Sequence, residues 1–155
     1  MTVYLGLGSN LGDRRAHLDA AVQALKLLGE VTRVSPYLET PALLAPGDTT
    51  PQPPYLNGVL AFETTLEPLA LLRALREIER AQGRPADRAR WQPRTLDLDI
   101  LLWGDRVIDT PELQVPHPQM HLRRFVLEPL AVIAGGAVHP VLEATVTELL
   151  ARSQR

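Results

Sequence analysis

The sequence contains no cysteine, and Lys26 is the single lysine among its 155 residues. Without cysteine, the chain can form no disulfide, no thiolate metal site and no thiol nucleophile. No apolar run approaches the roughly 20 residues that cross a bilayer, and no basic and apolar signal-peptide pattern begins the chain. We therefore expect a cytoplasmic protein without a membrane partner, folded as a single domain over residues 1–155.

Several nucleotide- and nucleic-acid-binding signatures are also missing. The formal net charge of −2 gives no overall attraction to nucleic acid, and aromatic residues make up only 5% of the chain. The phosphate-binding P-loop pattern does not occur. Gly6, Gly8 and Gly12 superficially suggest a dinucleotide fingerprint, but Leu11 stands where the third glycine belongs. We interpret these glycines as a tight turn packed near other backbone.

Hydrophobic periodicity predicts the element order β-α-β-β-α-β. Alternation predicts strands over 2–7, 31–38, 55–64 and 94–103, and apolar spacings of three and four predict helices over 14–28 and 68–82. A short strand over 106–108, a helix over 122–133 kinked or restarted at Pro129, and a final helix over 141–151 follow. This order favours an α+β, ferredoxin-like core, an antiparallel sheet with helices on one face, plus C-terminal additions.

Two carboxylates, Asp97 and Asp99, stand two positions apart inside an otherwise apolar strand. Because side chains alternate along a strand, both must project from the same face. Like charges side by side are costly to bury unless a cation neutralises them, and oxygen ligands suit Mg²⁺. A solvated strand face is the simpler explanation of such a pair. The apolar continuation and the arginines that precede it favour a metal site.

The segment before this strand is rich in arginine, with Arg84, Arg88, Arg90 and Arg94. Guanidinium groups beside metal-binding carboxylates suit a polyphosphate, whose oxygens bind both the arginines and the cation. A solvated charged loop remains the alternative. The long segment 40–54, with five prolines, is a second candidate functional loop.

The few aromatic residues occupy informative places. Tyr55 opens a predicted strand with Asn57 on its same face, Trp91 interrupts the arginine-rich segment, and Phe125 follows Arg123. Packing in the core is one interpretation of Phe125. Stacking against a flat heterocycle is the other.

Together these residues resemble the 6-hydroxymethyl-7,8-dihydropterin pyrophosphokinase family of folate biosynthesis. The resemblance extends over nearly the whole chain, and its most specific part is the strand Asp97–Leu101 after the Arg90-Trp91 and Pro93-Arg94 pairs. The other matching segments are GSNLGD at 8–13, Tyr55-Leu56-Asn57, Glu79 with Gln82-Gly83-Arg84, the rest of 93–104, and Val115-Pro116-His117 with Arg123 and Phe125.

The resemblance implies a ferredoxin-like enzyme that transfers diphosphate from ATP, as co-substrate, to the pterin alcohol and releases AMP. It further implies that Asp97 and Asp99 hold two Mg²⁺ ions and that Arg84 and Arg94 join them in catalysis. The residues implied to bind ATP are Glu79, Arg84, Trp91, Arg94, Ile100, His117 and Arg123. The residues implied to bind the pterin are Thr40, Pro41, Leu43, Tyr55, Asn57 and Phe125. We expect a monomer with no nucleic acid partner.

Three positions depart from the family pattern. Gln92 stands where glycine is usual, Ala86 where a second loop arginine is common, and Pro118 where an aromatic residue can occur. Arg88 could substitute for the missing arginine. A non-catalytic nucleotide-binding module and an RNA-binding sheet remain the alternative functions, and the first would bind nucleotide without consuming it.

Overall fold

The computed structural model describes residues 1–42, 44, 46–83 and 95–153. Its main sheet is antiparallel, with the order β2-β4-β1-β5, and β3 extends it beside β4. The strands are β1 (Val3–Ser9), β2 (Glu30–Val34), β3 (Leu38–Thr40), β4 (Tyr55–Glu63) and β5 (Asp97–Trp103). This is the predicted ferredoxin-like arrangement, in which the central pair β1 and β4 carries the longest register of paired residues.

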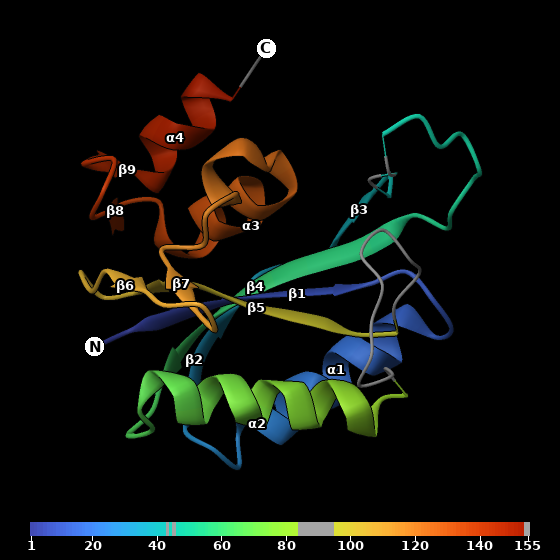
Figure 1. Cartoon of the computed structure of the whole chain (residues 1–155), viewed down its shortest axis with the longest axis horizontal. Coiled ribbons are helices and arrows are strands. Elements are labelled where there is room, and N and C mark those ends of the chain that lie inside the picture. The colour runs from blue at the N-terminus through green and yellow to red at the C-terminus, as the bar shows by residue number, and fades with distance from the viewer. Residues whose placement is uncertain (43, 45, 84–94, 154–155) are drawn as a thin grey trace.

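Two helices, α1 (Arg14–Leu25) and α2 (Pro68–Ala81), cover one face of this sheet (Figure 1). The side chain of Asp13 caps α1 by accepting a hydrogen bond from the backbone N–H of Ala16, and Pro68 opens α2. Their apolar stripes meet the inward side chains of the sheet in one buried cluster: Val3, Leu5, Leu18, Leu25, Leu60, Phe62, Leu71, Leu75, Leu98 and Ile100 are among its members. The apolar residues that recur every three or four positions in both helices are therefore buried against this face of the sheet.

The C-terminal part of the chain packs on the opposite face of the sheet (Figure 1). It comprises the 3₁₀ turn η1 (Met120–Leu122), α3 (Arg124–Ala134), β8 (Val138–His139), β9 (Ala144–Thr145) and α4 (Val146–Arg152). The short hairpin of β6 (Ile108–Asp109) and β7 (Gln114–Val115) instead contributes Ile108 and Val115 to the cluster under α1 and α2. A second buried cluster joins Leu127 and Leu130 of α3 to Val59 of β4 and Leu101 of β5. The predicted C-terminal additions thus cover the sheet face that α1 and α2 leave open.

The predicted strand over 31–38 is wrong, because the structure divides it into β2 and β3. Pro36 has no N–H to give to a ladder. Instead, the backbone N–H of Ser35 donates to Val59 O, and the Ser35 hydroxyl accepts from Val59 N–H at 2.9 Å. The chain therefore turns at Ser35–Tyr37, and β3 resumes pairing nearer the start of β4.

Several predicted boundaries also differ from the structure. The first helix ends at Leu25 instead of 28, the short strand is 108–109, and α3 runs through Pro129 without a break. The final helix begins at Val146, because the β8–β9 hairpin occupies the preceding residues and Thr145 closes a capping box with Glu148. Alternating apolar residues in so short a hairpin are hard to distinguish from a helical stripe.

A bulge in β5 sets which of its side chains share a face. Tyr4 pairs with Leu102 and Leu5 with Ile100, so Leu101 is the extra residue. Leu98 and Ile100 pack against α1 and α2, whereas both Leu101 and Leu102 belong to the cluster under α3. Asp97 and Asp99 precede the bulge and therefore alternate regularly onto the α3 face.

No helix in the described part of the chain is long and apolar enough to cross a membrane.

Candidate active site

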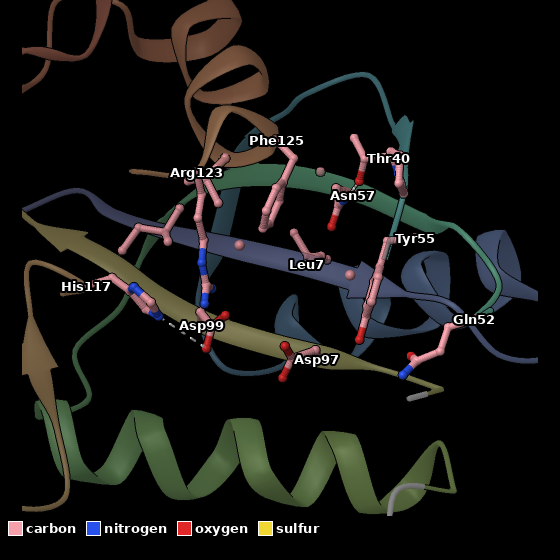
Figure 2. A pocket seen from close by; sticks show the side chains of 16 residues that line it. Leu7, Thr40, Gln52, Tyr55, Asn57, Asp97, Asp99, His117, Arg123 and Phe125 are labelled. Carbon is pink, nitrogen blue, oxygen red and sulfur yellow. Dashed lines mark hydrogen bonds and ion pairs between the residues drawn. The ribbon is translucent and has the colours of Figure 1, made fainter. Parts of the chain in front are cut away.

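A pocket opens on the α3 face of the sheet, beside the first residues of that helix (Figure 2). Strands β1, β4 and β5 form its floor, and residues around β3, from the proline-rich loop, after β7 and from α3 form its walls. The side chains that line it include Thr40, Gln52, Tyr55, Asn57, Asp97, Asp99, His117, Arg123 and Phe125. One cavity therefore collects residues from sequence positions more than eighty apart.

Two glycines of β1 keep the floor of this pocket open. Gly8 pairs with Asn57 on one side and Asp97 on the other, and Gly6 pairs in the same way with Val59 and Asp99. A Cβ atom on Gly8 would lie 3.1 Å from Asn57 Oδ1 and would crowd the Tyr55 ring at 3.3 Å. The earlier interpretation of Gly6 and Gly8 as part of a tight turn is wrong, since both lie within β1. Their nearest neighbours are side chains, those of Leu101 beside Gly6 and of Asn57 and Tyr55 beside Gly8, instead of the predicted backbone.

Asp97 and Asp99 both face the pocket, as the strand periodicity predicts. The Asp99 side chain is 30% exposed, and burial, followed by the charge of Asp97, raises its pKa to about 7. Arg76 and Arg123 partly offset this shift, and Glu79 adds to it. A divalent cation would relieve the same repulsion.

This donor set fits Mg²⁺ as part of a complex with a phosphate. No group of three or more potential histidine or carboxylate ligands occurs among the described residues. Mg²⁺ commonly takes one or two carboxylates from the protein and completes its shell with water and substrate phosphate oxygens. Asp97 and Asp99 would supply the protein ligands.

A histidine and an arginine complete this acidic end of the pocket. His117 Nε2 lies 4.0 Å from Asp99 Oδ1, and Arg123 extends from the start of α3 toward Asp99 (Figure 2). The backbone N–H of Gln119 donates to His117 Nδ1 at 3.1 Å, which places the remaining ring proton on Nε2, toward the pocket. Burial, followed by the charge of Arg123, lowers the pKa of His117 to about 4. His117 is therefore a neutral hydrogen-bond donor near pH 7.

Replacing His117 with glutamine should make the protein less sensitive to acid. The folded-state pKa lies below the unfolded value of 6.5, so wild-type stability falls as the pH drops from 6.5 through 4. The variant with the uncharged glutamine lacks this loss, so we expect it to gain about 3 kcal/mol of stability relative to the wild type near pH 4 and almost none at pH 7. Urea unfolding at both pH values measures it. An equal acid-induced loss in both proteins would contradict the assigned burial of His117.

The other end of the pocket is aromatic and uncharged. Phe125 projects from the first turn of α3, and Tyr55 stands at the start of β4 (Figure 2). Asn57 Nδ2 donates to Thr40 Oγ1 at 2.6 Å, which leaves the amide oxygen over Gly8. Pro41 closes the same wall. This end combines aromatic faces with an oriented amide, as recognition of a flat, hydrogen-bonding ring requires.

Two residues that were predicted to bind nucleotide do not line the pocket with their side chains. Ile100 is buried in the core between the sheet and helices α1 and α2. Glu79 is buried on α2, where its carboxylate accepts a hydrogen bond from the Leu98 N–H at 2.8 Å. A nucleotide role for these two residues stays a prediction. The predicted site residues Leu43, Arg84, Trp91 and Arg94 lie outside the described residues, so the structure does not test them.

Sequence reasoning did not single out Gln52, Leu101 or Val126, which also line the pocket. Leu101 continues the two-residue period of Asp97 and Asp99, so this period could have revealed it. Gln52 lies in a loop without periodicity. No sequence signal places it there. Its position depends on long-range contacts, since Asn10 Nδ2 donates to Pro53 O at 3.1 Å and Arg14 Nη1 to Pro54 O at 2.9 Å.

Comparison with known structures supports the fold. The chain aligns with a Plasmodium falciparum HPPK-DHPS chain carrying a triple mutation, solved with SDX-DHP, at a TM-score of 0.76 and 17% sequence identity. The alignment covers 97% of this chain and 44% of the other, so the present chain spans less than half of that longer protein. At this identity, the likeness establishes the ferredoxin-like fold alone.

Sequence comparison identifies the family. The chain is 51% identical over 135 residues to the 2-amino-4-hydroxy-6-hydroxymethyldihydropteridine pyrophosphokinase of Pseudomonas aeruginosa, covering 85% of this chain and 80% of the relative. It is 45% identical over 153 residues to the enzyme of the same name from Haemophilus influenzae, with coverages of 97% and 91%. The family model described as 7,8-dihydro-6-hydroxymethylpterin-pyrophosphokinase (HPPK) matches residues 4–135, a span that includes both ends of the pocket. These matches confirm the resemblance, and the chain is an enzyme that belongs to the 7,8-dihydro-6-hydroxymethylpterin pyrophosphokinase family.

Proposed function

We propose that the protein transfers the terminal diphosphate of MgATP to the hydroxymethyl group of 6-hydroxymethyl-7,8-dihydropterin, with AMP as the second product. Diphosphate transfer to this pterin is the activity of the family. The observation that carries the proposal is the joining of an acidic end, Asp97 and Asp99, to an aromatic end, Tyr55 and Phe125, within one pocket. A triphosphate and a flat ring could bind there side by side.

The pterin would lie between the aromatic side chains of Tyr55 and Phe125, with Asn57 reading its hydrogen-bonding edge. The hydrogen bond from Asn57 to Thr40 holds the amide in one orientation, so its oxygen accepts from a ring N–H. Pro41, and Leu43 by its sequence position, would complete this wall. Fixing the ring in this way aims the hydroxymethyl oxygen at the triphosphate.

The triphosphate would lie at the acidic end, where Arg123 donates to phosphate oxygens and the Nε2–H of His117 supplies a neutral donor. Arg84 and Arg94 would add phosphate contacts, and Glu79, Trp91 and Ile100 would border the nucleotide; these roles rest on the family resemblance. Two Mg²⁺ ions held by Asp97 and Asp99 would neutralise phosphate charge and align the reacting groups.

In the reaction, the hydroxymethyl oxygen bonds to the β-phosphorus while the bond from that phosphorus to the oxygen bridging to the α-phosphate breaks. AMP leaves with the bridging oxygen, and the hydroxyl proton passes to solvent. The protein's part is positioning together with stabilisation of charge on the phosphate oxygens by Arg123 and His117. No covalent intermediate with the protein is needed.

The decisive experiment is one incubation with MgATP and the pterin alcohol, followed by nucleotide chromatography. We expect AMP and the pterin diphosphate in equal amounts, and no product when EDTA removes the metal. ADP with a monophosphorylated pterin would refute the proposal. As a control for the acidic pair, Asp105→Asn changes an exposed carboxylate just after β5 and should leave turnover unchanged.

A further inference from the structure

The strand that carries the acidic pair is the last strand of the described sheet. β5 pairs with β1 along one edge only, and a strand with one open edge leaves alternate peptide groups without a ladder partner. The N–H and C=O of Leu98, which lies between Asp97 and Asp99, are such backbone groups. They belong to the two peptide groups that join Leu98 to Asp97 and to Asp99, so their orientation affects where both carboxylates point.

Side chains of helix α2 bind both of these backbone groups. Glu79 Oε2 accepts the N–H of Leu98 at 2.8 Å, and Arg76 Nη1 donates to the C=O of Leu98 at 3.0 Å. The two side chains also form an ion pair, with Arg76 Nη1 at 2.9 Å from Glu79 Oε2. Arg76, Glu79 and the backbone N–H and C=O of Leu98 therefore form a closed ring of hydrogen bonds against the open edge of β5.

The ring differs from an ordinary surface ion pair on the same helix. The Glu79 side chain is 2% exposed and that of Arg76 is 30% exposed. A carboxylate so deeply buried needs its charged and hydrogen-bonding partners, and removing one of them is costly. Arg80 and Glu77 form a second ion pair of α2, also three residues apart, with side chains 45% and 71% exposed. No contact between this second pair and β5 occurs among the interactions of the described residues, so it provides a matched control.

We infer that Arg76 is a positioning residue, which with Glu79 fixes the backbone of Leu98 so that Asp97 and Asp99 present their oxygens to the same metal-bound phosphate; this rests on the proposed function. The physical reason is that Mg²⁺ demands near-ideal octahedral geometry, so its affinity depends on how the ligand oxygens are oriented. Partners that orient metal ligands commonly contribute ten- to a hundredfold in metal affinity. Arg76 also lies close enough to Asp99 for its charge to act on that carboxylate.

The test measures metal binding directly, by electron paramagnetic resonance of Mn²⁺ titrated into protein with a non-hydrolysable ATP analogue. Arg76→Met should weaken Mn²⁺ binding about tenfold. It should lower kcat and leave the KM for the pterin within about twofold, because the aromatic end of the pocket does not touch Arg76. Arg80→Met should match the wild type in every respect.

A second variant keeps the test valid if Arg76→Met folds poorly. Arg76→Lys retains the charge beside Glu79, but its single ammonium group lacks the planar fork that reaches Glu79 and Leu98 together. We expect about threefold weaker Mn²⁺ binding at an unchanged melting temperature. Wild-type Mn²⁺ affinity in the folded Arg76 variants would overturn the inference and leave the proposed function intact. Absence of Mn²⁺ binding by the wild-type complex would overturn both.

Discussion

Asp99→Asn should abolish turnover and, without metal, make the protein more stable at pH 8. Loss of one of the two carboxylates removes a metal ligand and the stabilisation of phosphate charge that depends on it. Such contributions amount to several kcal/mol, so we expect at least about a thousandfold lower kcat. The gain in stability arises because the amide relieves both the burial of a charge and its repulsion by Asp97.

The sign of the stability effect follows from the raised pKa of Asp99. A carboxyl whose folded-state pKa exceeds the ordinary 3.8 stabilises the protein below pH 3.8 relative to neutral pH, and this contribution is lost as the pH rises through about 7. Because the Asp99 side chain is partly exposed to solvent, only part of the pKa shift counts toward stability. We therefore expect Asp99→Asn to raise the free energy of unfolding by about 2 kcal/mol at pH 8, a difference that shrinks toward pH 4.

Urea unfolding in EDTA at pH 8 and pH 5 measures this difference, and a coupled assay of AMP measures kcat. The exposed Asp105→Asn variant serves as the control in both. A less stable Asp99→Asn protein at pH 8 would show that a protein cation already neutralises the acidic pair, and the case for a bound metal would then fail.

Phe125→Ala should weaken binding of the pterin roughly ten- to a hundredfold, with a much smaller effect on kcat. The ring lines the aromatic end of the pocket and also packs against the cluster under α3. Loss of one aromatic face that stacks on a flat ligand costs about 1.4 to 2.8 kcal/mol. Nucleotide contacts at the acidic end should remain, so the KM for ATP should change little.

Steady-state kinetics with each substrate varied in turn tests this expectation. Leu122→Ala is the matched control, since Leu122 is a large apolar residue of η1, three positions earlier and 69% exposed. Thermal unfolding distinguishes a lost ligand contact from a damaged core. An unchanged KM for the pterin in a stable Phe125→Ala protein would refute pterin binding at the aromatic end of the pocket.

Much of the site was predictable from residue pattern. The same-face projection of Asp97 and Asp99 follows from the strand period alone, and the structure confirms it. The same rule places Tyr55 and Asn57 on one face of their strand, and both line the pocket. Glu79 and Ile100 show where pattern was insufficient, because a motif does not reveal whether a side chain faces the pocket or the opposite core.

Local order in the amino-acid sequence was sufficient for the types of the elements in the β-α-β-β-α-β core, for the ferredoxin-like class and for the residue types that line the pocket. These depend on periodicity and on contacts between near neighbours in the chain. Tertiary structure alone determined the bulge at Leu101 and the clamp of Arg76 and Glu79 on the backbone N–H and C=O of Leu98. Each depends on pairing between segments far apart in sequence, and a short local pattern contains no information about the partner that satisfies its backbone groups.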